Sequence, residues 1–403
     1  MRWIPSILLI CIVCSVIAED AGNWPMFQYD PQHSGHSPSK MPESLRIVWE
    51  YEEYGKHGGF FAVSGENLYV ARNFSLSALD IDEGSVLWSI ETKGKHILWN
   101  YPSVAESKIF TSATEGVLCF DAGTGEIIWN HEVERVDLYS SPLVIDNHVI
   151  VGGGKPWETN AKELARRVMC LHTETGELMW EFFARGMVNS SPAYLDGKIY
   201  INEGKRIYCL DAETGENVWE KEVEWTSSSS LSLNGKRVFV GTSKGIICLD
   251  IETEEILWKF DCGDWIFLTP AVAYEKVYAG TPHGIFYCVD ARNGDLIWKR
   301  ETKSIIYSEA VVADGKVAFG TGDGVVYIVD AESGKICESI SLDESGITAL
   351  VLSDGKLFVG QENGKITCFE ASSFEKLIRI LLVAVVIMLL FILVWHQRKK
   401  TFI

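Results

Sequence analysis

A short stretch of sequence returns about every forty residues, and it constrains the fold more than any other feature. In its clearest copy, residues 207–219, an apolar run leads to Asp211, the turn Glu213-Thr214-Gly215 and then Trp219. The repeated tryptophans are separated by 39, 41, 51, 39, 39 and 40 residues and are Trp49, Trp88, Trp129, Trp180, Trp219, Trp258 and Trp298. A period near 40 built from short β segments is typical of a β-propeller.

The repeats divide into eight units of four short strands. In the fourth unit the predicted strands cover residues 190–195, 198–202, 206–211 and 217–223, joined by tight turns in which glycine permits a positive φ. The eighth unit has only three strands, whereas residues 45–51 form a strand with no unit of its own. We therefore predict an all-β, eight-bladed propeller of four-stranded antiparallel blades, closed by the N-terminal strand, which removes the open edge at the seam.

The two ends of the chain differ from the repeats. Residues 1–18 combine one positive charge with an apolar run and small residues at Val16 and Ala18, as in a signal peptide cleaved after Ala18. Residues 374–395 are predicted as a transmembrane helix, followed by the basic tail 396–403. The positive-inside rule then predicts a single-pass plasma-membrane protein with its propeller outside and its C-terminus in the cytoplasm.

Between these ends, residues 19–44 are predicted as an N-terminal arm and residues 45–373 as the propeller. The arm is rich in turn formers and aromatic residues, and we expect it to lie extended on the propeller. The formal net charge of the chain is −19. Such a surface repels phosphate groups, so we expect no nucleic-acid partner, and it also repels anionic lipid.

The repeats resemble those of the pyrroloquinoline quinone (PQQ) repeat propellers. The matching text is the Asp-Ala-Glu-Thr-Gly-Glu-x-x-Trp turn, the Ser-Pro and Asp-Gly hairpins, and the segment from Trp24-Pro25-Met26-Phe27 to Gly35. The resemblance covers roughly residues 23–371. It implies an eight-bladed ring in which each repeated tryptophan, Trp49 included, docks on the turn of an adjacent blade and is structural.

This family contains both enzymes and proteins without catalytic activity. Its quinoprotein alcohol dehydrogenases carry PQQ against a ring of two adjacent cysteines, with a calcium site and a catalytic aspartate, and this chain has no adjacent cysteines. Another branch, of similar size, is the lipoprotein of the bacterial outer-membrane β-barrel assembly machinery, which is a protein-interaction scaffold. We expect no metal site and no cofactor, with PQQ and calcium as the alternative.

The extracellular cysteines follow the repeat rather than a chemical motif. Six of them occupy one slot, two residues before the end of the third strand of their unit, namely Cys119, Cys170, Cys209, Cys248, Cys288 and Cys368. A repeated slot lies at the same radius in every blade, so its occupants are about one blade apart, beyond the Cα separation of about 7 Å that a disulfide tolerates. We predict small, buried packing residues with free thiols.

Two departures from the repeat are candidate binding features. Aromatic residues before the inner strands are predicted to ring the mouth of the central channel, together with Glu309, which replaces Ser, Thr or Tyr in its slot; the aromatic residues are Trp99, Tyr101, Tyr139, Trp225, Trp265, Phe267 and Tyr307. An insertion at residues 154–167 of blade three carries basic and aromatic residues, namely Lys155, Trp157, Arg166 and Arg167. The alternatives are a hydrophobic plug in the funnel and a tolerated surface insertion.

Two glycosylation sequons begin at Asn73 and Asn189, and the second overlaps a predicted inner strand.

The sequence shows no recognisable set of catalytic residues. The reading that we favour is a membrane-anchored, extracytoplasmic propeller that binds an envelope protein or polymer as a non-catalytic scaffold. The alternatives are a quinoprotein dehydrogenase with PQQ in the funnel, stacked on an aromatic residue such as Trp265, and a sensor, although its cytoplasmic tail would be very short.

Overall fold

The structure, a computed structural model, describes residues 23–42, 44–52, 58–92, 98, 100–133, 137–154, 166–227 and 229–371. Every helix or strand assigned in these ranges is a strand. Within them, no helix meets the length and apolarity needed to cross a membrane. The predicted leader (1–18), transmembrane segment (374–395) and tail (396–403) lie outside the described residues.

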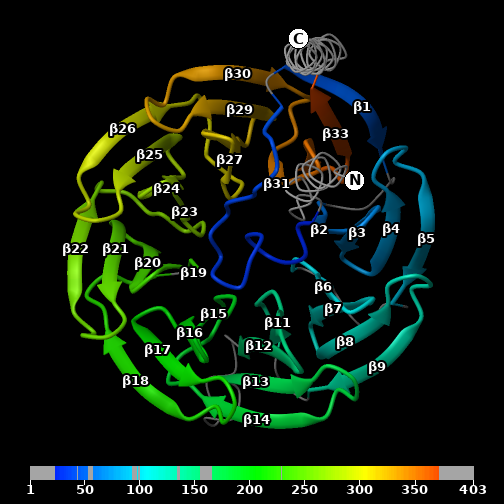
Figure 1. Cartoon of the computed structure of the whole chain (residues 1–403), viewed down its shortest axis with the longest axis vertical. Helices are drawn as coiled ribbons and strands as arrows, with labels where there is room; N and C mark the ends of the chain where they lie inside the picture. Colours follow the sequence, from blue (N-terminus) through cyan, green and yellow to red (C-terminus); the bar gives the residue numbers. More distant parts are fainter. Residues whose placement is uncertain are drawn as a thin grey trace, which may run out of the picture.

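The strands form eight antiparallel sheets that stand as blades around a central axis (Figure 1), so the predicted eight-bladed propeller is confirmed. Blade one consists of β2 (Phe60–Ser64), β3 (Asn67–Arg72), β4 (Ser75–Asp80) and β5 (Val86–Glu91). Blade two consists of β6 (Ser103–Ala105), β7 (Lys108–Ala113), β8 (Gly116–Asp121) and β9 (Ile127–Glu132). Blade three consists of β10 (Asp137–Leu138), β11 (Leu143–Ile145), β12 (His148–Gly154), β13 (Arg167–His172) and β14 (Leu178–Phe183).

The next three blades repeat the four-stranded plan. Blade four consists of β15 (Ala193–Leu195), β16 (Lys198–Asn202), β17 (Arg206–Asp211) and β18 (Asn217–Glu222). Blade five consists of β19 (Leu231–Asn234), β20 (Arg237–Thr242), β21 (Gly245–Asp250) and β22 (Ile256–Asp261). Blade six consists of β23 (Ala271–Ala273), β24 (Lys276–Gly280), β25 (Ile285–Asp290) and β26 (Leu296–Glu301).

The last two blades close the ring. Blade seven consists of β27 (Val311–Ala313), β28 (Lys316–Gly320), β29 (Val325–Asp330) and β30 (Ile336–Ser341). Blade eight combines β31 (Ile347–Ser353), β32 (Lys356–Gln361) and β33 (Ile366–Ala371) with the N-terminal strand β1 (Leu45–Tyr51). The register of β1 on β33 runs from Leu45 opposite Ala371 to Tyr51 opposite Ile366. The prediction that residues 45–51 complete blade eight is therefore confirmed.

Two sequence-based strand assignments need correction in blades three and four. Blade three has a fifth strand, because β10 and β11 both pair with β12. The inner strand of blade four begins at Ala193 rather than at residue 190, because the backbone ladder with β16 starts at Ala193 and Ser190 instead bonds Asn202 through its side-chain hydroxyl. Asn189 accordingly lies before the strand and is exposed, so its sequon does not overlap it.

The ring has two different faces. One face, which we call the hairpin face, carries the turn between the first and second strands of each blade and the turn between its third and fourth strands. A backbone hydrogen bond joins these two turns, as from the Ala212 amide to the Gly197 carbonyl at 3.0 Å in blade four. The opposite face, which we call the loop face, carries the connections between blades.

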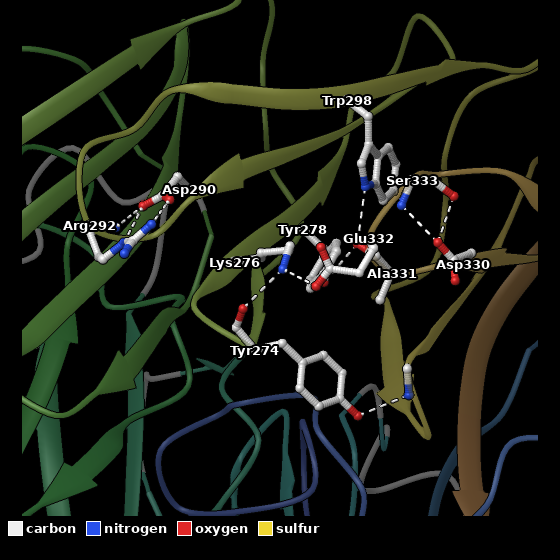
Figure 2. Close-up of polar contacts among 11 residues, drawn as sticks. Tyr274, Lys276, Tyr278, Asp290, Arg292, Trp298, Asp330, Ala331, Glu332 and Ser333 are labelled. Carbon is white, nitrogen blue, oxygen red and sulfur yellow. Dashed lines mark hydrogen bonds and ion pairs between the residues drawn. The ribbon is translucent and has the colours of Figure 1, made fainter.

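Each repeated tryptophan lies against the next blade, and blades six and seven show how (Figure 2). The Trp298 indole donates to the carbonyl of Ala331 at 3.1 Å, and the Tyr278 hydroxyl reaches the same oxygen at 3.3 Å. Gly334 lies under the indole, where a Cβ would come within 2.6 Å of the ring, and its φ is +65°. The Asp330 carboxylate accepts from Ser333 and fixes the turn. Glycine and tryptophan are thus required together.

The same indole-to-carbonyl bond recurs around the ring. It joins Trp49, Trp88, Trp129, Trp180 and Trp258 to the carbonyls of Ile81, Ala122, Thr173, Ala212 and Ala291, respectively. For Trp219 no such bond is found among the described residues. The turn that it faces has Glu254, at φ +59°, where the other docking turns have glycine. A side chain at this position explains why Trp219 does not dock in the same way.

The cysteine slot lies directly opposite the tryptophan slot in the sheet register. Cys119, Cys170, Cys209, Cys248, Cys288 and Cys368 face Trp129, Trp180, Trp219, Trp258, Trp298 and Trp49. All six cysteines are buried and free, as predicted. Burial raises the pKa of the Cys119 thiol to about 12. These thiols are packing groups beside the indoles.

Candidate functional site: the central channel

The N-terminal arm winds around the inside of the ring instead of lying extended on it. Figure 1 shows it as the dark blue trace at the centre. Its backbone bonds the inner strands of six blades in chain order, at 2.7 to 2.9 Å; the paired residues are Trp24 with Val63, Pro25 with Val104, Pro31 with Tyr194, Gln32 with Leu233, Ser34 with Val272, and Gly35 with Val312. Met26 packs with the core residues of blade three, and the Ser37 hydroxyl donates to Leu352 of blade eight. The arm therefore contacts all eight blades.

The course of the arm depends on tight turns. Gln28, Tyr29 and His33 have φ values of 56°, 78° and 57°, which residues other than glycine adopt only where their surroundings enforce it. Gly35 has a φ of +63°, and a Cβ there would come within 2.9 Å of both the Ala271 side chain and the Ala310 carbonyl. Glycine is therefore required where the arm passes closest to blades six and seven.

On the loop-face side of the arm, the residues that precede the inner strands connect neighbouring blades by hydrogen bonds. A backbone amide of one blade donates to a serine hydroxyl of the next, from Tyr101 to Ser141, from Ser141 to Ser191 and from Ser191 to Ser230, at 3.2, 3.0 and 2.8 Å. In blade seven the corresponding slot holds Glu309. Its side chain is longer than that of serine, so it can reach across the channel.

Glu309 and Tyr101 meet on the inside of the ring. The Tyr101 hydroxyl donates to Glu309 Oε2 at 3.3 Å, which joins blade two to blade seven. The Tyr101 ring packs on Phe27 of the arm, with ring centroids 5.1 Å apart, and on Phe60 of blade one at 4.9 Å. The Tyr101–Glu309 hydrogen bond, which we call the bridge, is therefore packed against the arm. Two of the predicted mouth residues come together here.

Burial governs the charge of this region. It raises the pKa of Glu309 to about 7 and that of Tyr101 well above its ordinary value. In the arm, burial lowers the pKa of His33 to about 4, and His33 Nδ1 lies 2.9 Å from the Leu231 carbonyl. Burial also raises the pKa of Asp30. The channel is therefore a poor environment for charge of either sign.

A cavity of about 10 Å³ remains between the arm and the bridge. It is lined by Trp24, Phe27, Gln28, Tyr101, Glu309, Ala310, Val311 and Leu350. This volume is room for about one water molecule. Trp24 Nε1 and Gln28 Oε1 are buried without a hydrogen-bond partner among the described residues. A donor and an acceptor that both lack a partner suit a water molecule better than a metal ion.

Other aromatic residues of the predicted mouth lie apart from this bridge. Trp225 is buried between blades four and five, with the amino groups of Lys244 and Lys259 at 5.8 and 5.4 Å from its ring centroid. Its ring packs in the core between these blades and does not line the cavity beside Glu309. Trp265 is 57% exposed on the loop face, next to an Asp264–His283 pair separated by 2.8 Å.

Of the remaining candidate residues, some are placed by the structure and others lie outside the described residues. Phe267 and Tyr139 are half-buried, and the Tyr139 hydroxyl donates to Asp137 at 3.3 Å. Tyr307 is exposed. In the insertion, Arg166 is exposed and donates to the Arg185 carbonyl, while Arg167 pairs with Glu181 of the outer strand at 3.0 Å. Trp99, Lys155 and Trp157 lie outside the described residues, and Asn73, of the first sequon, is half-buried in a loop-face turn.

Sequence analysis missed the contribution of the arm to this site. Trp24, Phe27 and Gln28 lie far from Glu309 in the chain, and only the ring closure brings them together. The available signal was a cluster of three aromatic residues, Trp24, Phe27 and Tyr29, in a segment without strand periodicity, because such side chains tend to be buried. In the ranges that the structure covers, no group of three or more His, Cys, Asp or Glu side chains could hold a metal ion.

Comparison with known proteins gives a family and a fold. The family model described as "Outer membrane protein assembly factor BamB" matches residues 42–155, 159–224, 203–350 and 282–377. No curated protein sequence matches the chain.

Among solved structures, BamB from Moraxella catarrhalis is similar with a TM-score of 0.65 and 16% identity, covering 81% of this chain and 100% of that one. A europium-containing methanol dehydrogenase has a TM-score of 0.75 and 15% identity, covering 89% and 100%. The quinohemoprotein alcohol dehydrogenase of Comamonas testosteroni has a TM-score of 0.74 and 15% identity, and the match covers 89% of this chain and 82% of that one. At these identities the structural neighbours establish the fold alone.

Proposed function

Since this chain belongs to the PQQ-like propeller family of the outer-membrane assembly factor BamB, we propose that it is a non-catalytic scaffold that binds an envelope protein or polymer. The observation that carries the proposal is the filled channel. The arm bonds the inner strands around the axis, and the Tyr101–Glu309 bridge crosses above it. Sites for small molecules usually occupy about 300–1,000 Å³, whereas the cavity under the bridge is about 10 Å³.

The alternative is a quinoprotein dehydrogenase with PQQ and calcium in the funnel. The residues at the bridge do not fit this cofactor, because the rings of Phe27 and Phe60 already pack on the Tyr101 ring beside a cavity of about 10 Å³. The predicted stacking residue, Trp265, is on the loop face beside blade six and does not line the cavity. We therefore derive no reaction step through PQQ.

We also propose an orientation for the scaffold, supported by where the last described strand ends. Ala371, the last described residue, ends β33 on the hairpin face, three residues before the predicted transmembrane segment begins. Asn23 lies on the same face, where its side chain accepts from the Gly65 amide at 2.8 Å. With an anchor at residues 374–395, the hairpin face would lie toward the plasma membrane. The loop face would then be the outer, partner-binding surface.

The test compares photo-crosslinking from the two faces of the full-length protein in its own membranes. A crosslinker at Trp265 reports on the loop face, and one at Glu252, in an exposed turn, reports on the hairpin face as a matched control. We expect one discrete adduct from position 265 that excess unlabelled protein competes away, and no such adduct from position 252. Equal labelling from both positions would contradict the assignment of the loop face.

A separate measurement tests the alternative. PQQ is titrated into the full-length protein with and without calcium, and absorbance and tryptophan fluorescence are followed. We expect no saturable binding at tens of micromolar PQQ. Stoichiometric quenching would overturn the scaffold proposal and identify a quinoprotein.

A further inference from the structure

A pocket of ligand size opens on the hairpin face, outside the channel. One wall is the end of the N-terminal arm, residues 38–42, and the other is the first hairpin turn of blade eight together with the end of β33. Its volume is about 420 Å³. This lies within the range of about 300–1,000 Å³ that is usual for small-molecule sites, unlike the cavity beside Glu309.

The arm side of this pocket is held in place by the fold. Met41 is fully buried in the hydrophobic core that includes blade eight, and the Asp354 amide donates to the Ser39 hydroxyl at 3.1 Å. Pro38 and Pro42 restrict the backbone because the proline ring fixes φ. The pocket is therefore preformed, so a ligand would not have to order its walls.

The lining of the pocket carries charges of both signs. Lys40 and Asp354 both line it, and the side chain of neither has an ion-pair or hydrogen-bond partner among the described residues. Lys356 and Glu370 line it as well, but they are only 9% and 8% exposed and form ion pairs with other residues. A ligand with one negative and one positive group would pair with Lys40 and Asp354 together, whereas a simple anion or cation would leave one of them without a partner.

The position of the pocket connects it with the predicted membrane anchor. Ala371, which ends β33, is a lining residue, and the predicted transmembrane segment begins three residues later, at residue 374. Three residues span at most about 11 Å, and the headgroup layer on each side of a bilayer is about 5–8 Å thick. In the orientation given above, with the hairpin face toward the membrane, lipid headgroups are therefore within reach of the pocket.

We propose that this pocket binds the headgroup of a zwitterionic phospholipid, a phosphate linked to a primary ammonium, with the phosphate at Lys40 and the ammonium at Asp354. This inference rests on the orientation of the scaffold given under Proposed function. A net charge of −19 disfavours an anionic lipid, because the protein as a whole repels it. A zwitterion has no net charge and avoids this repulsion. Once bound, the lipid would hold the hairpin face at the bilayer surface.

The test is native mass spectrometry of the full-length protein released from nanodiscs that contain equimolar phosphatidylethanolamine and phosphatidylglycerol. We expect wild type to retain one phosphatidylethanolamine in preference to phosphatidylglycerol. Lys40→Gln removes the partner of the phosphate and should lower this retention about tenfold, as expected for the loss of one charge-assisted hydrogen bond. Lys335→Gln is the matched control, because Lys335 is exposed in a hairpin-face turn of blade seven and does not line the pocket.

Equal retention by wild type and Lys40→Gln would overturn the proposal, and so would an equal loss in Lys335→Gln. A second variant, Asp354→Asn, tests the other end of the ligand. Asparagine tolerates the φ of +47° at this position, so the turn is kept while the partner of the ammonium is lost. The preference for phosphatidylethanolamine over phosphatidylglycerol should then disappear, and an unchanged preference would refute the assignment of Asp354.

Soluble glycerophosphoethanolamine separates a lipid from a free small molecule of the same chemistry. We expect it to displace the retained lipid from wild type only weakly. Binding of the soluble headgroup that depends on Lys40, without retention of the bilayer lipid, would overturn both the lipid assignment and the proposed orientation. If neither binds, the lipid site is refuted, whereas photo-crosslinking from position 265 still reports independently on the scaffold.

Discussion

The indole nitrogen of Trp49 lies 3.1 Å from the carbonyl oxygen of Ile81, so the strand that closes blade eight is itself docked on blade one. The same bond joins Trp258 to Ala291 between blades five and six. The two bonds are chemically equal but topologically different. The chain continues into the next blade in both cases, but β1 is held in its own blade only by pairing with β33, whereas β22 directly follows β21 within one blade.

We predict that Trp49→Phe and Trp258→Phe each lose about 1 kcal/mol of stability, the usual net value of one hydrogen bond. Thermal unfolding of both variants measures this loss. Limited proteolysis should separate them, because only Trp49→Phe should release fragments that end within residues 24–51. Equal proteolysis of the two variants would show that the seam is no weaker than an ordinary junction between blades.

Glu254 occupies a position with φ +59° where the other docking turns have glycine. We predict that Glu254→Gly stabilises the protein by about 1 kcal/mol, because glycine adopts this backbone without strain. The matched control is Gly215→Ala in the neighbouring turn, where a Cβ would lie within 2.6 Å of the Trp180 ring. That variant should melt at a lower temperature than wild type. A lower melting temperature for Glu254→Gly would show that the glutamate side chain contributes contacts that outweigh its strain.

The cysteines of the propeller should differ sharply in reactivity. Burial raises the pKa of Cys170, Cys248, Cys288 and Cys368 to about 12, so these thiols stay protonated and inaccessible. Cys337 is exposed. In the native protein at pH 8 we expect a thiol reagent to modify Cys337 rapidly and the buried slot only after unfolding. Peptide mapping of the adducts gives the answer, and rapid native labelling at Cys248 would contradict it.

The turn aspartates should make the ring unstable in acid. The Arg292 side chain lowers the pKa of Asp290 to about 2, and hydrogen bonds from Ser333 lower the pKa of Asp330. A lowered carboxyl pKa stabilises the fold above the ordinary value near 3.8, and this contribution is lost as pH falls through the folded value. We expect melting temperatures to fall from about pH 4 toward pH 2.

Asp330→Asn provides the control for this pH dependence. It should reduce stability at pH 6 and weaken the loss between pH 4 and pH 2, because the substituted turn no longer titrates. An Asp330→Asn protein with the full wild-type acid dependence would indicate that other carboxylates determine it.

The blade plan could be predicted because it is local. The second and third strands of blade four agree with the sequence-based prediction to the residue, and so does the closing strand β1. Turn residues with a required φ, together with a tryptophan at a fixed distance, determine each unit within about 40 residues. The inner strand of blade four was predicted too long because Ser190 bonds Asn202 of the next strand through its side chain, and the backbone ladder starts only at Ala193.

The sequence by itself determined the repeat, the number of blades and the closing strand, because each depends on spacing along the chain. The tertiary structure alone decided that the arm fills the channel and that Glu309 meets Tyr101. It also decided that Trp225 packs into the core while Trp265 stays exposed. These outcomes depend on which residues share a radius and a height once eight blades close into a ring, and no local pattern encodes that closure.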